Sequence, residues 1–233
     1  MKDWGSKTVA RSGAAESNGP KPRKRAAASR LDDARARMYQ ELIFESAECV
    51  FGEKGFEGAT MQDIASEAGV SLKTVYAAFA GKQELYGAIM HARGRAMLEA
   101  VDAARLPLSD PIEKLVAGTR AFVQFLFDNR DWMRLHARSR HSWAVRPEDE
   151  EAGQLWDEGH KSHSELLRAG IKSGVFWEDD PDETAVMIHG LIRVHVAHAL
   201  SRDETDAKTV ANRLIARLLR MVCRDSVKLR EVG

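Results

Sequence analysis

The sequence has no uninterrupted run of about 18 apolar residues, so it predicts no membrane-spanning helix. It also lacks the apolar core of a signal peptide at its N-terminus, and we therefore expect a cytoplasmic protein. Cysteine is scarce. Cys49 and Cys223 both lie in segments with helical apolar spacing, which favours two buried free thiols over a disulfide or a redox switch.

Proline and glycine are sparse after residue 37, and alternating β-branched segments are nearly absent. Strands and their turns depend on these features, so the pattern predicts an all-α fold. The 233 residues, 44% of them hydrophobic, suffice for one large domain or for a small domain followed by a larger one.

The formal net charge is zero, so the overall charge gives no sign of nucleic-acid binding and has to be examined locally. Residues 1–37 hold ten lysines and arginines against four acidic residues, with a compact cluster at Arg23, Lys24 and Arg25. We expect residues 1–33 to be a disordered basic arm, because they are rich in small and polar residues. Such an arm can follow the DNA backbone or enter the minor groove, or it can be a solubilising tail.

Residues 60–79 have the pattern of two short helices joined by a tight turn. Thr60, with Asp63 three positions later, resembles a capping box, and the apolar residues that follow recur at helical spacing. Gly69 stands where a left-handed C-cap is expected, and Ser71 is the predicted N-cap of the second helix. The pattern is typical of a helix-turn-helix, whose second helix lies in the DNA major groove; an ordinary helical hairpin is the alternative.

A helix is predicted on each side of this segment. The first covers residues 33–54. Its apolar stripe consists of Tyr39, Ile43, Ala47, Val50 and Phe51. The second runs from residue 82 to about residue 106 and carries Lys82 in its first turn, where the helix dipole disfavours a cation. A phosphate bound at this helix N-terminus would resolve the conflict, whereas a solvated lysine would cost little.

The span from Ala36 to Met97 resembles the DNA-binding domain of tetracycline-repressor-like (TetR) transcription regulators. The residues that carry the resemblance are Phe51, Gly55, Phe56, Thr60-Met61-Gln62-Asp63-Ile64-Ala65, Ala68-Gly69-Val70-Ser71, Val75-Tyr76, Phe79 and Lys82-Gln83-Glu84-Leu85. The resemblance implies an all-α protein of about nine helices. Its helix-turn-helix domain would occupy residues 34–97, and a ligand-binding and dimerisation domain would occupy residues 98–228.

The resemblance also implies roles for single residues. Thr60, Tyr76 and Lys82 would contact DNA phosphates, and the segment Ser71, Leu72, Lys73 and Thr74 would face base edges. Two residues depart from the family pattern. Lys73 stands where many members have glycine, and Ala78 stands where members often have histidine or an aromatic residue. These departures concern the operator sequence rather than the binding mode.

The second half of the chain predicts five further helices. Asp110 followed by Pro111 is a good helix start, as is Asp180 followed by Pro181, and the acidic run at residues 148–151 suits a helix N-terminus. The expected ranges are about 110–129, 131–142, 146–170, 180–201 and 204–224.

The last two of these helices carry more apolar surface than one small domain needs for its own packing. The predicted interface residues are Val186, His189, Ile192, Arg193, Val196, Leu214 and Leu218. Burying these faces in a two-fold homodimer, which the resemblance favours, would present two recognition helices to successive major grooves. Alternatively, the two helices close the core of a single chain.

Aromatic residues concentrate in the C-terminal half, with histidines among them. The predicted pocket for a small apolar or aromatic ligand consists of Phe122, Phe125, Trp132, His136, Trp143, Trp156 and His160. For each residue taken singly, core packing is the simpler interpretation, and the resemblance is what favours a pocket. His160 and His163 share a helix face, but no cysteine or carboxylate cluster completes a metal site, so we expect no metal and no cofactor.

Three functions are compatible with these patterns. The first is a homodimeric repressor that binds double-stranded operator DNA and is released by a small-molecule effector. The second is a DNA-binding regulator that responds to a protein partner or to no ligand. The third, an all-α enzyme or ligand carrier, has little support, because the sequence shows no nucleophile–base constellation and no glycine-rich phosphate loop. We therefore expect neither an enzyme nor a membrane partner.

Overall fold

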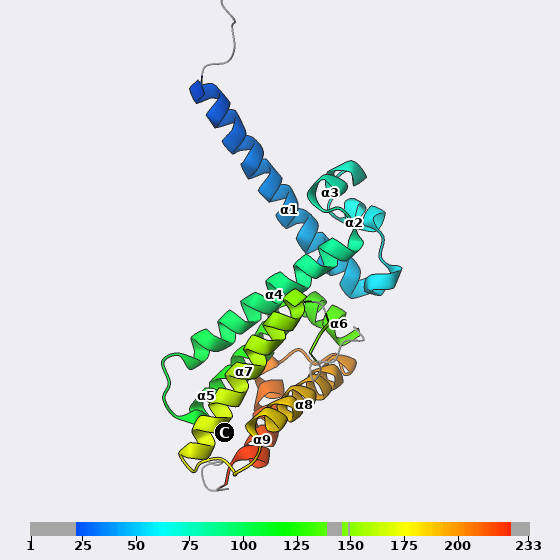
Figure 1. The fold of residues 1–233 in the computed structure, drawn as a ribbon. Helices are drawn as coiled ribbons and strands as arrows, with labels where there is room; N and C mark the ends of the chain where they lie inside the picture. Colours follow the sequence, from blue (N-terminus) through cyan, green and yellow to red (C-terminus); the bar gives the residue numbers. More distant parts are fainter. Residues whose placement is uncertain (1–21, 139–145, 149, 225–233) are drawn as a thin grey trace, which may run out of the picture. The chain divides into compact units, whose positions relative to one another are not determined.

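A computed structural model describes the backbone of residues 22–138, 146–148 and 150–224, and the side chains of residues 34–135, 146–148 and 150–224. Within these ranges the chain forms nine helices (Figure 1). They are α1 (Pro22–Gly58), α2 (Met61–Glu67), α3 (Leu72–Ala78), α4 (Lys82–Arg105), α5 (Pro111–Asp128), α6 (Arg130–Arg138), α7 (Glu150–Lys172), α8 (Pro181–Ser201) and α9 (Ala207–Val222). The all-α prediction is confirmed.

The chain divides into two compact units, residues 1–38 and residues 39–233, and α1 belongs to both. This helix begins at Pro22, well before the predicted start at residue 33. Proline suits a first helical position, and residues 23–51 contain no glycine or proline that would interrupt the helix. The backbone of residues 22–33 is thus helical, which corrects the prediction of a disordered arm for this part. Residues 1–21, and the side chains of Arg23, Lys24 and Arg25, lie outside the described residues.

Gly55 interrupts α1 next to its predicted end at residue 54. Its backbone angles are φ 71° and ψ 167°, which are not helical. The interruption lets Phe56 fold back onto Phe51, with the ring centroids 5.9 Å apart. Tyr86 of α4 closes the group, with its ring centroid 4.9 Å from that of Phe56. Offset and edge-on ring contacts of this kind stabilise beyond the burial of their surface.

The turn between α2 and α3 is closed by backbone hydrogen bonds. The amide of Val70 donates to the carbonyl of Ala65 (3.0 Å), and the amide of Gly69 donates to the carbonyl of Ser66 (3.2 Å). This is a Schellman motif, and it requires the left-handed backbone of Gly69, whose φ is 63°. The predicted C-cap is confirmed.

The C-terminal helices form a bundle around α5. This helix contacts α4, α6, α7 and α9, while α8 packs against α7 and α9 (Figure 1). Two identical Asp-Pro starts position α5 and α8. The carboxylate of Asp110 accepts the amides of Ile112 and Glu113, and the carboxylate of Asp180 accepts those of Asp182 and Glu183. Both predicted starts are confirmed.

One cluster of buried apolar side chains extends from Ile43 of α1 to Cys223, which follows α9. Burial of a single large member, such as Ile89 of α4 or Leu126 of α5, stabilises the fold by about 1.5–3 kcal/mol. Because α4 contributes to this cluster along its length, it belongs both to the helix-turn-helix region and to the C-terminal bundle.

Candidate functional site

Helix α3 has one face in the core and one face in solvent. Val75 is fully buried, whereas Lys73 is exposed and Tyr76 keeps 51% of its surface exposed. The hydroxyl of Ser71 accepts the amide of Thr74 (3.1 Å), which confirms the predicted N-cap. An exposed cation beside an exposed tyrosine, on a helix anchored from behind, is the arrangement that a recognition helix needs.

The hydroxyl of Thr60 forms hydrogen bonds with Asp63 in the first turn of α2. Its hydroxyl oxygen accepts the amide of Asp63 (3.1 Å), and its hydroxyl donates to the Asp63 carboxylate (2.7 Å). The predicted capping box is confirmed. Lys54 also donates to Asp63 at 2.7 Å, and the hydrogen bonds from Lys54 and Thr60 lower the pKa of this carboxyl to about 2. Because the Thr60 hydroxyl donates within the domain, its phosphate contact remains only a prediction.

Lys82 binds backbone carbonyls at the end of α1. Its Nζ donates to the carbonyl oxygens of Phe56 (2.7 Å) and Ala59 (3.1 Å), and it lies 3.4 Å from that of Glu57. An ammonium has three donors, and here they face the carbonyls at the end of α1, where a cation is favourable. The lysine therefore joins α4 to α1, and its phosphate contact stays a prediction.

A partly buried ion pair also links α1 to α4, and the sequence analysis missed it. Glu48 is 7% exposed and accepts two hydrogen bonds from Arg93, at 2.8 Å and 2.5 Å. The guanidinium of Arg93 also lies 5.7 Å from the ring centre of Phe44. The signal that could have revealed the pair is the position of Glu48 beside Ala47 and Phe51 on the buried side of α1.

The residues predicted to bind a ligand lie in separate pairs. Phe125 of α5 meets Trp132 of α6 edge to face, with ring centroids 5.9 Å apart. Trp156 and His160, one turn apart on α7, stack with ring centroids 4.7 Å apart. Phe122 packs against the core, and the side chains of His136 and Trp143 lie outside the described residues. The ligand pocket therefore stays a prediction.

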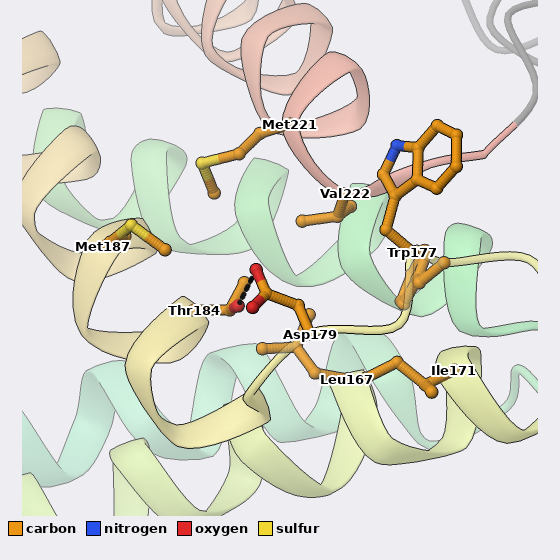
Figure 2. Close-up of a pocket in the computed structure, with 9 residues that line it drawn as sticks. Leu167, Ile171, Trp177, Asp179, Thr184, Met187, Met221 and Val222 are labelled. Atoms are coloured by element: carbon orange, nitrogen blue, oxygen red, sulfur yellow. Dashed lines mark hydrogen bonds between the residues drawn. The ribbon is translucent and has the colours of Figure 1, made fainter.

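A small pocket lies between α7, α8 and α9, and Figure 2 shows its lining. Its volume is about 30 Å³, which is space for one or two water molecules. The Thr184 hydroxyl donates to the Asp179 carboxylate (3.3 Å) in its wall. The lining residues are Leu167, Ile171, Phe176, Trp177, Asp179, Thr184, Met187, Met221 and Val222. None of the predicted ligand residues with described side chains is among them.

A buried polar cluster at the contact of α4, α7 and α8 was also missed by the sequence analysis. Arg105, at the end of α4, is 8% exposed. It donates to the Ser162 hydroxyl (3.0 Å) and lies 3.1 Å from Nε2 of His163. Nδ1 of His163 lies 3.1 Å from the carbonyl oxygen of Gly159 and 3.2 Å from Nε2 of His189. We name Arg105, Ser162, His163 and His189 the Arg105 cluster.

Burial determines the protonation of the Arg105 cluster. It lowers the pKa of Arg105 to about 10 and that of His189 to about 4. Burial, together with the positive charge of Arg105, also lowers the pKa of His163 well below its ordinary value. At neutral pH the cluster therefore holds one positive charge and two neutral imidazoles. The sequence signal was Arg105 itself, which lies one turn after Val101 on the apolar stripe of α4.

Four of the seven residues of the predicted dimer interface are buried in the core of the single chain. Ile192, Val196, Leu214 and Leu218 are each at most 3% exposed, so they cannot meet a second copy. Val186, His189 and Arg193 are partly buried. For the four buried residues, the alternative interpretation holds, because both helices pack these side chains against the chain's own core.

Another face of α8 carries apolar side chains that are exposed to solvent. Met187 and Val194 are 50% and 67% exposed, and the partly buried Leu191 lies between them. The spacing of four and then three residues places all three on one helix face. We name these three side chains the α8 face.

Within the described ranges, no group of three or more histidine, cysteine, aspartate or glutamate side chains is placed to hold a metal ion. None of the helices in that part of the chain is both long and apolar enough to cross a membrane. Cys49 and Cys223, both described, are not joined in a disulfide.

Residues 43–89 match the family model of bacterial regulatory proteins of the tetR family. One curated relative is the HTH-type transcriptional activator FasR of Mycolicibacterium smegmatis, which is 32% identical over 95 residues. That alignment covers 41% of this chain and 43% of FasR, so the match spans less than half of this relative.

Solved structures extend the likeness over most of the chain. A bacterial regulatory protein of the tetR family from Rhodococcus RHA1 is 26% identical, with a TM-score of 0.68 over 80% of this chain and 98% of that one. The fatty acid degradation regulator FadR from Bacillus halodurans has the same fold at 20% identity, with a TM-score of 0.68 over 78% of this chain and 94% of that one. The matched segment, the helix-turn-helix and the shared all-α fold agree: residues 43–89 match the tetR family of bacterial regulatory proteins, and most of the chain is similar to solved regulators of that family.

Proposed function

We propose that this chain is a homodimeric transcriptional repressor that binds double-stranded operator DNA through α3 and releases it when a small apolar or aromatic ligand binds among the C-terminal helices. The observation that carries DNA binding is the solvent face of α3, where Lys73 and Tyr76 are exposed while Val75 anchors the helix. Lys73 can reach a base edge or a phosphate, and the Tyr76 hydroxyl can donate to a phosphate. The basic residues Arg23, Lys24 and Arg25 would add contacts to the DNA backbone.

A second copy is the proposed partner of the α8 face. In a two-fold dimer, each copy presents the same surface, so Met187, Leu191 and Val194 would meet their counterparts. Two copies arranged in this way would carry two α3 helices that reach successive major grooves of one operator.

Helix α4 is the proposed route between ligand and DNA. It is bonded to α1 through Glu48–Arg93 and to α7 through the Arg95–Glu158 pair and the Arg105 cluster. A ligand that binds more tightly to one arrangement of α4 and α7 would shift the equilibrium between two spacings of the α3 helices. A ligand that binds both arrangements equally would not release DNA.

The test is a measurement of operator affinity. Genomic DNA captured by the protein gives the operator, and gel retardation then compares variants on it. We expect Tyr76→Ala and Lys73→Ala each to weaken binding about tenfold, since one lost contact to DNA costs about 1–3 kcal/mol. Lys161→Ala, which removes an exposed lysine from α7, is the matched control and should leave affinity unchanged. Unchanged affinity of both α3 variants would contradict the proposal.

A transcriptional reporter behind the captured operator tests the sign of regulation. Loss of the regulator should raise reporter output if the protein is a repressor. A fall in output would instead indicate activation, the role that the name of FasR gives to that relative.

A further inference from the structure

We propose that Arg105 anchors an anion-binding site in the C-terminal domain, and that the site takes a small apolar molecule bearing one carboxylate or phosphate group. The inference deepens the proposed function, because it names the chemistry of the ligand that would act on α4. The support comes from the buried charge of Arg105, from the polar side chains around it, and from the packing of α4 against α5 and α7.

Among the residues whose side chains are described, no carboxylate forms a hydrogen bond or ion pair with Arg105. Its hydrogen-bond partners are the Ser162 hydroxyl and the neutral His163 imidazole. Asp102, one turn earlier on α4, attracts the guanidinium, but no hydrogen bond joins the two side chains. The Nε of Arg105 is buried and has no hydrogen-bond acceptor. Buried arginines are almost always paired, because an uncompensated charge in a low-dielectric interior is costly.

The neighbouring histidines cannot supply the missing negative charge, but they can orient a bound anion. Nε2 of His163 accepts from Arg105, so its Nδ1 carries the proton and faces the Gly159 carbonyl and Nε2 of His189. His160, stacked on Trp156, adds a buried Nδ1 without a hydrogen-bond partner. Unmet polar atoms of Arg105 and His160 thus lie on neighbouring helices, α4 and α7.

The apolar part of the proposed ligand has neighbours of matching character. Leu98 of α4 packs on Gly159, where an added Cβ would lie 3.2 Å from its Cδ2. Leu155 of α7 packs on Gly94 in the same way, at 3.3 Å. Glycines on one helix face leucines on the other, so the contact between α4 and α7 is closed by leucine side chains packed on glycines. A ligand with an apolar body can insert between them by displacing these leucines.

Gly118 of α5 leaves the space that the guanidinium of Arg105 fills. An added Cβ at this position would lie 2.3 Å from Nε of Arg105, so an alanine would force the guanidinium to move. An anion that draws Arg105 toward itself would loosen its contacts with Ser162 and His163 on α7. The ligand would thereby act on the contact between α4 and α7, which is the movement that the proposed function requires.

Thermal unfolding without DNA tests the site directly. The probes are matched sets with the same apolar body: hexanoate, hexyl phosphate and hexanol, and benzoate, phenyl phosphate and benzyl alcohol. We expect at least one anion to raise the melting temperature of the wild type by roughly 5 °C at saturation, with no rise for the alcohol of the same set. Comparing carboxylate with phosphate decides between the two anions. If no anion of either set exceeds its alcohol, the proposal is wrong.

Variants assign the effect to Arg105. Arg105→Met keeps the volume and removes the charge, so it should abolish the anion-dependent rise. Arg95→Met is the matched control, because Arg95 also lies on α4 and binds α7, but at the surface. It should keep the rise. Should Arg105→Met fail to fold, Arg105→Lys and Gly118→Ala provide the test. The lysine keeps the charge without the planar fork, and the alanine displaces the fork, so each should weaken anion binding about tenfold or more.

The outcomes separate the site from the proposed function. An anion that stabilises the wild type through Arg105 but leaves operator binding unchanged supports the site and contradicts ligand release. Equal stabilisation of the wild type and Arg105→Met contradicts the site, whatever the operator measurements show.

Discussion

The Nζ of Lys82 lies 2.7 Å from the carbonyl oxygen of Phe56 and 4.5 Å from the centre of the Phe56 ring. A cation in the first turn of α4 is unfavourable for α4 itself, but it is favourable beside the carbonyls that end α1. The ammonium group of Lys82 lies on α4 but is stabilised by the carbonyl oxygens at the end of α1. This pairing sets the start of α4 against the end of α1.

Replacement of Lys82 should therefore lower stability. We expect Lys82→Met to reduce the free energy of unfolding by about 1–3 kcal/mol, because carbonyls at the end of α1 lose a charged donor. Urea unfolding followed by circular dichroism measures the effect. Lys73→Met, on the exposed side of α3, should change stability by less than about 0.5 kcal/mol. If Lys82→Met unfolds at the wild-type urea concentration but binds DNA more weakly, the result would support the predicted phosphate contact of Lys82 instead.

The Glu48–Arg93 pair should show energetic coupling. A double-mutant cycle with Glu48→Gln and Arg93→Met should give a coupling energy of about 1–2 kcal/mol, since Glu48 is buried but Arg93 still touches solvent. The exposed Arg95–Glu158 pair, also held by two hydrogen bonds, is the control and should couple more weakly. Equal coupling of the two pairs would contradict the importance of burial here.

Stability should fall as the pH drops below about 6.5. Burial lowers the pKa of His189 from 6.5 to about 4, and it also lowers the pKa values of His163 and His195. Between these pH values, the unfolded chain binds protons that the folded chain does not bind, so lowering the pH favours unfolding. For His189 alone the loss from pH 6.5 to pH 4 is roughly 3 kcal/mol.

Chemical denaturation at a series of pH values checks this expectation. His189→Gln should reduce the slope of stability against pH between 6.5 and 4.5, above the range in which most carboxylates titrate. His198→Gln removes an exposed histidine from the same helix and should leave the slope unchanged. A wild-type stability that stays constant across this interval would show that the buried histidines do not titrate as described.

The α8 face should control oligomeric state. We expect Val194→Glu to shift the protein from dimer to monomer in sedimentation equilibrium, because a charge would be buried where two copies meet. Gln83→Glu, an exposed site in the first turn of α4, introduces the same charge and should leave the dimer intact. A Val194→Glu variant that sediments as wild type would place the interface elsewhere.

Local signals in the sequence determined most of the secondary structure. The capping box of Thr60, the left-handed Gly69, the N-cap at Ser71 and the two Asp-Pro starts depend on atoms a few residues apart. Such contacts form within one helical turn, so residue type and spacing are enough to predict them. Together with the flanking residues Phe51 to Phe56 and Lys82 to Leu85, the signals between residues 60 and 79 were enough to indicate a resemblance to TetR regulators.

Tertiary structure decided which partner each charged side chain has and which face of a helix is covered. Lys82 meets a carbonyl 26 residues away, and Arg105 meets a histidine 58 residues away. Helix α8 has apolar residues on two faces. Ile192 and Val196 are buried in the chain's own core, whereas Met187 and Val194 are exposed to solvent. Periodicity shows that a helix has apolar faces, but only the packing of distant segments decides which face is buried, because burial depends on contacts that the local sequence does not contain.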